Sequence, residues 1–312
     1  MNDIQNIHVS FILSTFNKAP FLDRVLNNIR EFKRPDDELI LMDGGSTDDT
    51  AAIVRKHKDI ITLFESEKDR SAAHAYNKAM LKASGRIIIN LNDDDYFYPS
   101  GIRQAIATMD EHPDIDVLIC GGELVKIDEK TGREIVFQYQ YLPPGKRIDP
   151  VTNLFHLPIA FLLLNRKIIP LAGIYDTTIQ AADGYYTSQL LRCGANYKYL
   201  NVKMFKLYHY SHSSSLVHGR ATRRDIIAVL ARHGRWAEIL RMPCGEAGNA
   251  FHLNVDKDGT VKDKMVAAYL KACLAIITFP LWSLGFWWRL ATYLKSRSKA
   301  SLTEPDWDGV LR

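Results

Sequence analysis

Apolar residues in the first hundred positions follow two alternating patterns: short runs rich in β-branched residues, and longer stretches where they recur every three or four positions. The runs at 7–15, 38–42 and 60–64 have the length of strands, and each is followed by a stretch with helical spacing. A fourth run, from Arg86 onward, shows no alternation, which is typical of a strand buried on both faces. This order predicts an α/β fold with a Rossmann-like, mostly parallel central sheet flanked by helices.

The second half of the chain shows a less regular pattern of short apolar runs separated by a proline-rich loop at 140–158. The same spacing rules predict further strands and helices there. In chain order we expect a helix beyond Pro99, an apolar stretch at 116–127, strands at 134–139 and 159–165, a helix at 185–193, one or two strands within 197–210 and a basic amphipathic helix near 220–242.

One uncharged stretch, 272–288, lies near the C-terminal end. It has the minimum length of a membrane-spanning helix, Pro280 and Gly285 interrupt it, and basic residues flank it on both sides. These features predict a C-terminal helical extension at 216–312 that associates with the membrane surface through 265–295. The alternatives are a true span and a helix buried in the core or at a homodimer interface.

Composition excludes several classes of function. The 312-residue chain carries a formal charge of +4 and a pI near 8.7, which is too weakly basic for nucleic acid to be the principal partner. Its four cysteines form no Cys-x-x-Cys pair, so neither a zinc ribbon nor a disulfide scaffold is expected. Because the first residues carry no signal region, we expect a cytoplasmic protein, peripheral at the cytoplasmic face of the membrane.

Three consecutive carboxylates, Asp93, Asp94 and Asp95, directly follow the fourth strand; we call them the acidic triplet. Ligands of open α/β sheets bind at the carboxyl edge of the strands, where the triplet should lie. Adjacent carboxylates repel one another unless a cation offsets their charge, and their oxygens suit Mg²⁺ or Mn²⁺ that also contacts a phosphate. The alternative is an acidic turn that caps a helix.

Three further turns follow the other strands, and parallel strands would bring them to the same edge as the acidic triplet. Carboxylates there can accept hydrogen bonds from a base or a ribose, while a cation neutralises a diphosphate. The combination predicts a site for a nucleotide diphosphate. The three turns are Thr15-Phe16-Asn17, Asp43-Gly44-Gly45-Ser46 and Asp69-Arg70.

These motifs resemble those of the family 2 glycosyltransferases of the GT-A fold, over roughly 7–215. The most specific match is the segment 43–50, which is similar to the family's Asp-Gly-(Gly/Ser)-Ser-Thr-Asp-x-Thr. Residues 15–17 resemble the family's Thr-(Tyr/Phe)-Asn, and 91–95 resemble its metal-binding Asp-x-Asp equivalent. Residues 67–79 resemble Asp-x-Gly-x-x-x-Ala-x-Asn-x-Gly, with Ser71 and Ala79 in place of glycines. Residues 173–192 resemble Gly-x-(Phe/Tyr)-Asp followed by Asp-Tyr-(Asp/Glu)-Leu-x-x-Arg, with Gly184 in place of the usual aromatic residue.

The resemblance implies a role for each matching residue. Asp183 would be the general base that takes a proton from the acceptor hydroxyl, and Asp95 would be the metal ligand. Asp93 and His212 would lie beside the metal, and His209 and His156 are weaker candidates near the diphosphate and the acceptor. The donor-binding residues, with the first turn and Asp43 on the base, would be Thr15, Phe16, Asn17, Asp43, Gly44, Ser46, Asp69, Arg70, Asn77 and, on the ribose, Asp94.

The implied enzyme is an inverting glycosyltransferase that uses a nucleotide-diphosphate sugar, most often a UDP-sugar, with Mn²⁺ or Mg²⁺. Its acceptor would be a hydroxyl of a glycan or a polyprenyl-linked carrier. A GT-A domain at 1–215 would divide into a nucleotide-binding half at 1–98 and an acceptor half at 99–215. Two alternatives remain open: a sugar nucleotidyltransferase, and a catalytically silent nucleotide-binding or scaffold subunit.

Overall fold

The computed structural model describes residues 7–128, 131–142, 162–179, 182–210 and 304–311. Contacts between residues divide the chain into two units, of which Met1–Ser211 with Glu304–Arg312 forms the first and His212–Thr303 the second. Every element below belongs to the first unit. The predicted helix near 220–242 and the apolar stretch 272–288 lie outside the described residues. No described helix is long and apolar enough to cross a membrane.

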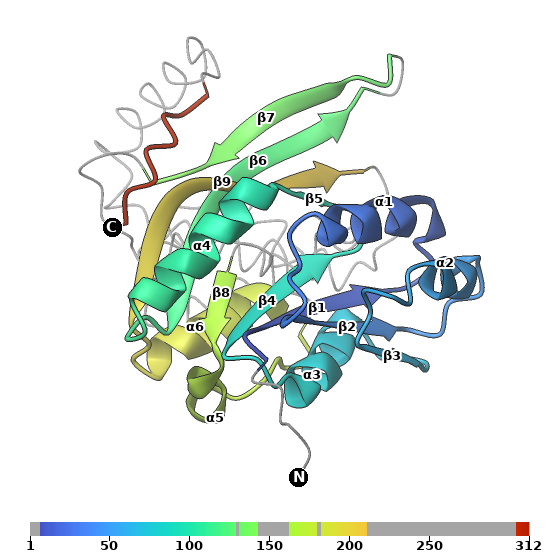
Figure 1. The fold of residues 1–312 in the computed structure, drawn as a ribbon, viewed down its shortest axis with the longest axis horizontal. Coiled ribbons are helices and arrows are strands. Elements are labelled where there is room, and N and C mark those ends of the chain that lie inside the picture. Colours follow the sequence, from blue (N-terminus) through green and yellow to red (C-terminus); the bar gives the residue numbers. More distant parts are fainter. Residues whose placement is uncertain (1–6, 129–130, 143–161, 180–181, 211–303, 312) are drawn as a thin grey trace, which may run out of the picture. The chain divides into compact units, whose positions relative to one another are not determined.

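Strands and helices alternate through the first hundred residues, as the hydrophobic pattern predicts (Figure 1). The elements are β1 (Val9–Thr15), α1 (Ala19–Arg30), β2 (Glu38–Asp43), α2 (Thr50–Lys56), β3 (Leu63–Ser66), α3 (Ala72–Lys82), β4 (Ile87–Asn92), β5 (Tyr96–Phe97), α4 (Pro99–Glu111), β6 (Val117–Ile127), β7 (Glu134–Gln140), β8 (Leu162–Asn165), the 3₁₀ turn η2 (Arg166–Ile168), α5 (Ile169–Ala172), α6 (Ala182–Arg192) and β9 (Tyr197–His209).

The described strands form one sheet in the order β3-β2-β1-β4-β8-β6-β9-β5, with β7 paired to β6. The first four strands in this order are parallel, as are β6 and β9. Strand β8 lies antiparallel to both of its neighbours, β4 and β6. Strands β5 and β7 are also antiparallel to their partners, β9 and β6. The predicted α/β sheet is therefore confirmed: its first four strands are parallel, and the antiparallel pairs lie in the second half of the sheet.

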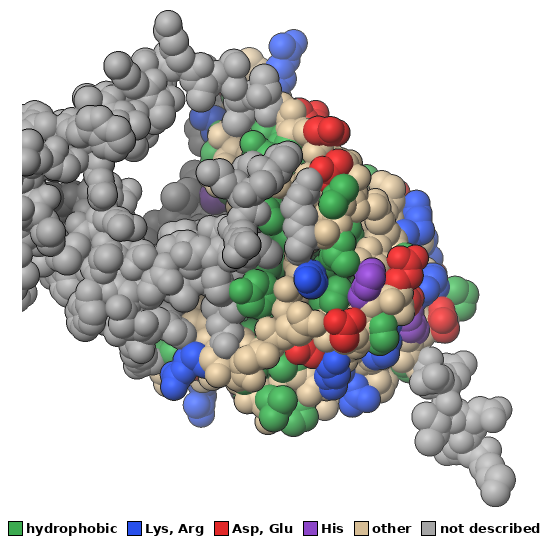
Figure 2. Space-filling model, turned by 90° about the vertical axis from the view of Figure 1, so that its left-hand side faces the viewer, with side chains coloured by type: hydrophobic (Ala, Val, Ile, Leu, Met, Phe, Trp, Pro, Cys, Tyr) green, Lys and Arg blue, Asp and Glu red, His purple; other side chains and the backbone are tan. Residues whose placement is uncertain are grey.

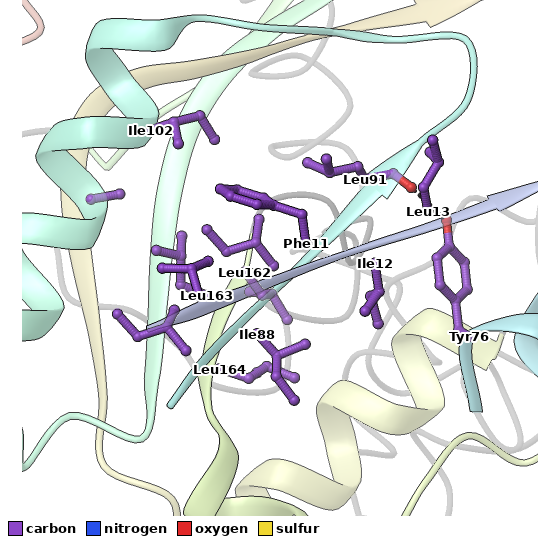
Figure 3. Packing of buried hydrophobic residues seen from close by; sticks show 14 of the residues in the cluster. Phe11, Ile12, Leu13, Tyr76, Ile88, Leu91, Ile102, Leu162, Leu163 and Leu164 are labelled. Carbon is purple, nitrogen blue, oxygen red and sulfur yellow. Dashed lines mark hydrogen bonds between the residues drawn. The ribbon is translucent and has the colours of Figure 1, made fainter. Parts of the chain in front are cut away.

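The core confirms the interpretation of the unalternating apolar runs. Strand β4 is buried from Ile87 to Leu91, and Phe11, Ile12 and Leu13 of β1 are completely buried beside it. In Figure 3 these side chains pack with the leucines of β8, so strands from both halves of the unit share one core. A strand covered on both faces needs apolar residues at successive positions, which explains the pattern.

Two helix and strand boundaries differ from the sequence-based prediction. The segment predicted as a strand from residue 60 first closes a turn, in which the Ile60 amide donates to the His57 carbonyl, so β3 begins only at Leu63. Helix α6 begins at Ala182 rather than at 185, which places Asp183 in its first turn. A carboxylate is favourable there because the helix dipole is positive at the N-terminus.

The C-terminal tail, 304–311, packs against β6 and β9 of the first unit, although the sequence assigned it to the helical extension. Leu311 forms a β-bridge with Leu200 of β9. Lys203 of β9 pairs with Glu123 of β6 at 3.0 Å and with Glu304 of the tail. The chain therefore leaves the first unit after residue 211 and returns to it at residue 304.

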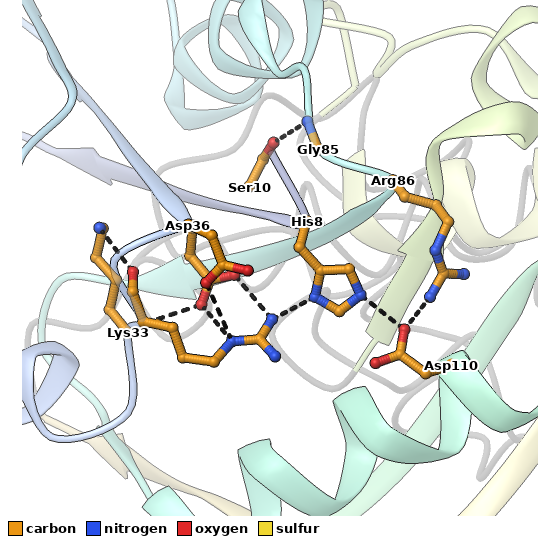
Figure 4. A network of polar contacts seen from close by, with 9 residues as sticks. His8, Ser10, Lys33, Asp36, Gly85, Arg86 and Asp110 are labelled. Atoms are coloured by element: carbon orange, nitrogen blue, oxygen red, sulfur yellow. Dashed lines mark hydrogen bonds and ion pairs between the residues drawn. The ribbon is translucent and has the colours of Figure 1, made fainter. Parts of the chain in front are cut away.

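Ion pairs close the amino edge of the sheet, opposite the strand ends that carry the predicted site (Figure 4). His8 lies between Arg34 and Asp110, which also pairs with Arg86. Ser10 accepts a hydrogen bond from the Gly85 amide at 2.8 Å. On the face shown in Figure 2, positive and negative side chains are interspersed over the described surface.

Candidate active site

Strands β1, β2, β3 and β4 end at the same edge and bring the predicted turns together. The register pairs Thr15 with Asp43, Asp43 with Ser66, and Ser14 with Asn92. The first turn, the Asp43 turn and the acidic triplet therefore follow three adjacent strands. The sequence anticipated this convergence from the parallel order alone.

The turns after β1 and β2 bind each other. The Asn17 amide donates to the Ser46 hydroxyl at 2.8 Å, and Asn17 Oδ1 accepts from the Thr47 amide at 2.9 Å. Asn17 has a positive φ of 52°, a conformation that asparagine adopts more readily than most residues. A Cβ at Gly44 would lie 3.2 Å from the Phe16 ring, so glycine lets that ring approach the second turn closely.

Phe16 is the exposed member of the first turn, with 57% of its surface accessible, whereas Thr15 before it is buried. The hydrogen bonds of Asn17 fix the backbone beside it, so the ring is held at the edge at little further entropic cost. A planar, exposed aromatic ring is suited to stacking a nucleobase, a contact worth about 1–3 kcal/mol. This is the kind of contact that the sequence predicted for the turn.

Asp43 is buried, and most of the hydrogen bonds to its carboxylate come from Ser46 of the same turn. It accepts hydrogen bonds from the Ser46 amide at 3.1 Å, the Ser46 hydroxyl at 2.5 Å and the Ser66 hydroxyl at 2.6 Å. A carboxylate has about four acceptor positions, so roughly one remains for a ligand. The predicted contact between Asp43 and the base therefore stays a prediction. In the structure, the Asp43 carboxylate stabilises the turn that follows β2.

Asp69 is neutralised by helix α3. Its carboxylate lies 2.8 Å from Lys78 Nζ and 2.9 Å from His74 Nδ1, and little of its side chain is exposed. Arg70, the next residue, is exposed at the same turn. Ser71 then caps α3, because its hydroxyl accepts from the His74 amide, which explains why a serine stands where the family has a glycine.

Asn77, predicted to bind the donor, is buried and forms two hydrogen bonds with Tyr175. Its Nδ2 donates to the Tyr175 carbonyl and its Oδ1 accepts from the Tyr175 amide, both at 2.8 Å. These bonds tie α3 to the segment that leads into α6. The observed role of Asn77 is thus to position that segment, and its predicted donor contact stays untested.

The acidic triplet is embedded in hydrogen bonds. Asp95 is 2% exposed; its Oδ1 accepts from the Tyr208 amide at 2.8 Å and its Oδ2 from Asn92 Nδ2 at 2.7 Å. Asp94 pairs with Lys18 at 2.5 Å, and its carbonyl accepts from Arg24 at 2.6 Å. The alternative of a solvated acidic cap is wrong for Asp95, because burial removes that carboxylate from water.

Burial dominates the protonation of the triplet. It raises the pKa of Asp93 to about 7 and that of Asp95 to about 8, and the charge of Asp94 raises both further. The ammonium of Lys18 lowers the pKa of Asp93, while the hydrogen bonds from Tyr208 and Asn92 lower that of Asp95; neither effect offsets burial. Without a further positive charge, burial therefore favours the neutral forms of Asp93 and Asp95.

This donor set fits a divalent cation. Among the described residues, no three His, Cys, Asp or Glu side chains are grouped closely enough to hold an ion by themselves. Mg²⁺ is commonly bound through one or two carboxylates while water and substrate phosphates complete its coordination. Asp95, with Asp93 or Asp94, matches such a partial site.

The metal-free protein should have a distinctive pH dependence of stability. The folded protein holds the protons of Asp93 and Asp95 up to about pH 7 and pH 8, whereas an unfolded aspartate releases its proton at about pH 3.9. Between these values the folded state binds more protons, so this contribution to stability is complete below about pH 4 and is lost as the pH rises to about 8. We expect the urea midpoint in chelator to fall between about pH 5 and pH 8.

The Asp93→Asn variant is the matched control for this titration. It removes one of the two raised groups, so its midpoint should fall less steeply over the same range. A midpoint that is constant or rises with pH in the unmodified protein would show that the triplet is ionised without metal.

The phenol of Tyr76 connects the two halves of the site. It donates to the Leu91 carbonyl and to Asn92 Oδ1, both at 3.1 Å, on the strand that carries the triplet. Its pKa is raised well above the ordinary value, first by burial, then by the charge of Asp183, and then by the charges of Asp93, Asp95 and Asp94. The Tyr76 ring also lies 6.0 Å from the Tyr175 ring, which stacks on Tyr186 of α6, so Tyr76 links the strand that carries the triplet to the helix that carries Asp183.

Asp183 is half-buried in the first turn of α6. Its backbone carbonyl accepts a hydrogen bond from the Thr187 hydroxyl at 2.8 Å, and this bond does not involve the Asp183 carboxylate. Tyr175 stacks on Tyr186 of α6 at 4.4 Å between ring centroids, and its hydroxyl accepts from Asn90 of β4 at 2.9 Å. Aromatic packing and one buried hydrogen bond thus hold α6 against β4.

Of the predicted histidines, the structure describes His209 alone. It ends β9, its ring packs on Phe137 at 5.1 Å, and burial lowers its pKa. These contacts indicate a structural role. The predicted site residues His212 and His156 lie outside the described residues.

The structure adds residues that sequence reasoning missed. Lys18, just before α1, and Arg24 of α1 bind Asp94, while Asn92 and Tyr208 bind Asp95. Lys18 had a signal, since it directly follows the Thr-Phe-Asn turn. No sequence signal predicted the hydrogen bond from the Tyr208 amide, because the sequence does not show which distant strand will lie beside the triplet.

Comparison with solved structures identifies the class of fold. The 1–349 fragment of Staphylococcus aureus TarS, solved in complex with UDP-GlcNAc, matches with a TM-score of 0.58 and 17% identity, over 78% of this chain and 79% of that one. A mannosyltransferase, PcManGT from Pyrobaculum calidifontis, solved with GDP-Man and Mn²⁺, matches with a TM-score of 0.55 and 18% identity, over 86% and 80%. The predicted GT-A fold is thus confirmed.

The model of the family described as glycosyl transferase family 2 matches residues 10–169. The chain belongs to this family. One relative is the poly(ribitol-phosphate) beta-N-acetylglucosaminyltransferase TarS of Staphylococcus aureus strain Mu50, 25% identical over 276 residues, which are 84% of this chain and 43% of that protein. The chain therefore spans less than half the length of this relative. Membership favours glycosyl transfer over both alternatives left open by the sequence.

Proposed function

We propose that this glycosyltransferase transfers a sugar from a nucleotide-diphosphate sugar, in the first place a UDP-sugar, to an acceptor hydroxyl with inversion at the anomeric carbon. Asp183 acts as the base, and the acidic triplet holds Mn²⁺ or Mg²⁺. The observation that carries the proposal is that Tyr76, hydrogen-bonded to Asn92 just before the triplet, packs on Tyr175, which in turn stacks on the helix that carries Asp183. The relative named above is an N-acetylglucosaminyltransferase, and its fragment was solved with UDP-GlcNAc.

The donor end of the site follows from the two bound turns. The Phe16 ring would stack on the base, while the hydrogen bonds between Asn17, Ser46 and Thr47 fix the backbone of the turn that carries it. Asp94 lies one strand further along the edge, where it can accept from a ribose hydroxyl. Arg70 is exposed at the neighbouring turn and can meet a phosphate.

Asp95 is the residue best prepared to hold the cation. Each of its oxygens accepts one fixed hydrogen bond, which orients the carboxylate and leaves further lone pairs for an ion. When bound, a divalent cation offsets the charge that develops on the departing diphosphate. A cation also favours the ionised form of Asp95, so binding near neutral pH releases protons.

Asp183 supplies the proton transfer. Its carboxylate accepts the proton of the acceptor hydroxyl as that oxygen bonds to the anomeric carbon. The bond from this carbon to the diphosphate oxygen breaks at the same time, and its electron pair leaves with the diphosphate. A single displacement of this kind inverts the configuration. Because Asn77 and Tyr186 fix the segment around α6, the base is presented on a rigid support.

The acceptor is proposed to be a glycan or a polyprenyl-linked carrier at the cytoplasmic membrane surface, approached through 265–295. Residues on both sides of this segment, up to Ser211 and from Glu304, belong to the same unit. A segment that leaves and re-enters one folded unit crosses a membrane an even number of times or not at all. This supports surface association, or a re-entrant hairpin, over a single span.

A panel of donors tests the proposal. We expect the full-length protein with Mn²⁺ to bind UDP in calorimetry and to hydrolyse a UDP-sugar slowly without acceptor, and to do neither at a comparable level in chelator. GDP-sugars serve as the comparison for the base contacts, and dTDP-sugars also lack the ribose 2′-hydroxyl. If no nucleotide sugar binds or is hydrolysed with Mn²⁺, the proposed donor and metal dependence are wrong.

A further inference from the structure

One positive charge lies within the acidic triplet. Lys18, which precedes α1, donates to Asp94 Oδ2 at 2.5 Å. Its side chain is 23% exposed and that of Asp94 is 16% exposed, so the pair lies at the surface of the site rather than in the core. Lys18 therefore occupies an oxygen of the residue that was predicted to contact the ribose.

The contacts of Lys18 leave it able to move. An ammonium has three donors, and among the described residues Asp94 is its one hydrogen-bond acceptor. Its second neighbour is the Phe21 ring, at 5.3 Å from Nζ, which is a weak and undirected contact. Four flexible methylenes carry the charge, so Nζ can shift by several ångströms while the backbone of Lys18 keeps starting the helix.

Arg24, by contrast, is fixed. It donates to the Asp94 carbonyl at 2.6 Å, and its guanidinium lies 4.8 Å from the centre of the Tyr208 ring. These contacts hold the backbone of the triplet without neutralising a carboxylate. Lys18 pairs with the Asp94 carboxylate, which a ligand can also bind, whereas Arg24 binds the backbone carbonyl of Asp94.

We propose that Lys18 is an exchangeable counter-ion: its ammonium neutralises Asp94 while the site is empty, and moves to a diphosphate oxygen when a nucleotide diphosphate and its cation occupy the triplet. This inference rests on the proposed function and adds to it a residue that recognises the donor. Asp94 is then released to accept a hydrogen bond from the ribose. Lys18 therefore opposes binding of the cation alone and favours binding of the nucleotide.

The two states predict opposite effects of removing the charge. Burial lowers the pKa of Lys18, but the hydrogen bond and charge of Asp94 more than offset this and keep it charged. Without ligand, its loss leaves the triplet more negative and frees an oxygen of Asp94, which favours a cation. With nucleotide present, its loss removes a charge-assisted hydrogen bond to the diphosphate. A lysine that only holds α1 to the triplet would weaken both.

The experiment compares Lys18→Met with the unmodified full-length protein in two titrations. Binding of Mn²⁺ alone, followed by electron paramagnetic resonance, should become tighter by about tenfold, the size of one surface charge interaction at close range. Binding of UDP at saturating Mn²⁺, followed by calorimetry, should become weaker by about tenfold. Lys18→Arg keeps the charge and should leave the Mn²⁺ affinity within about twofold of the unmodified protein.

Lys56→Met is the matched control, because it removes an ammonium that pairs with Asp23 at 2.7 Å away from the triplet. It should change neither affinity. If Lys18→Met weakens both ligands, or leaves the Mn²⁺ affinity unchanged, the exchange is refuted while the proposed function stands. If the unmodified protein binds no UDP with Mn²⁺, the proposed function fails, and this inference fails with it.

Discussion

Replacing Asp183 by asparagine should lower the rate of sugar transfer by about a thousandfold, within the 10²–10⁴ range that a positioned general base contributes. The amide has the same shape but cannot accept the acceptor's proton. Donor affinity should stay within about threefold, because Asp183 lies on α6, apart from the turns that hold the nucleotide. Steady-state transfer and UDP calorimetry on the same preparation measure the two quantities.

The fold should tolerate this change. The hydrogen bond between Thr187 and residue 183 uses the backbone carbonyl, and loss of a first-turn carboxylate costs at most about 1 kcal/mol. Asp176→Asn is the control; that carboxylate caps a turn by accepting from the Thr178 amide at 2.9 Å in the segment before α6. Its transfer rate should change by less than about tenfold. If Asp183→Asn loses donor binding as well, Asp183 is a structural residue and the base lies elsewhere.

Asp95→Asn should abolish metal-dependent nucleotide binding and reduce transfer by at least about a thousandfold, as expected when the charge that offsets a diphosphate is lost. A neutral amide is a poor ligand for Mg²⁺ or Mn²⁺ in place of a carboxylate. The change also has a structural cost: both Asp95 oxygens accept hydrogen bonds, from Tyr208 and Asn92, and the new NH₂ group would face one of these donors. We expect a loss of about 1–3 kcal/mol of stability.

Asp93→Asn separates the roles within the triplet. It removes a neighbouring carboxylate that the resemblance places at a variable position, so its transfer rate should stay within about tenfold of the unmodified protein. Calorimetry of UDP at several Mn²⁺ concentrations shows whether a variant has lost the metal or the nucleotide. Retention of Mn²⁺-dependent UDP binding by a folded Asp95→Asn protein would move the metal ligand to Asp93 or Asp94.

Residues at the edge of the sheet were predictable because their constraints are local. The run before Asp93 must be apolar, since both faces of β4 are covered, and the carboxylates must follow it because the interior cannot solvate them. Parallel order then brings the ends of β1, β2 and β4 together. The presence of these strands and the identity of this edge therefore follow from the local pattern of apolar and acidic residues.

The use that each side chain makes of its atoms was not predictable. Asn77 matches a donor-binding motif, yet both ends of its amide bind Tyr175, which is 98 positions away. Asp43 matches a base-binding motif, yet most of its acceptor capacity closes its own loop. A motif specifies the residue type at a position, and the neighbours that satisfy its hydrogen bonds are decided by packing.

The second half of the unit depended on long-range contacts. An apolar run at the position of β8 is compatible with either strand direction, and pairing with β4 and β6 made it antiparallel. The tail from Glu304 also joined the first unit through Leu200 and Lys203 of β9. Sequence separation of this kind leaves no local signal, because the energy comes from surfaces that meet only in the folded chain.

The sequence by itself thus determined the α/β fold, the edge that carries the site, the acidic triplet and Asp183 as the residue to test, since periodicity, turn chemistry and motif are properties of neighbouring residues. Only the tertiary structure decided that Asp95 is buried between Tyr208 and Asn92, that Lys18 occupies Asp94, and that Tyr76 and Tyr175 link the strand before the triplet to helix α6. Burial and pairing of charges depend on distance in space, and distance in space is set by the packing of the whole unit.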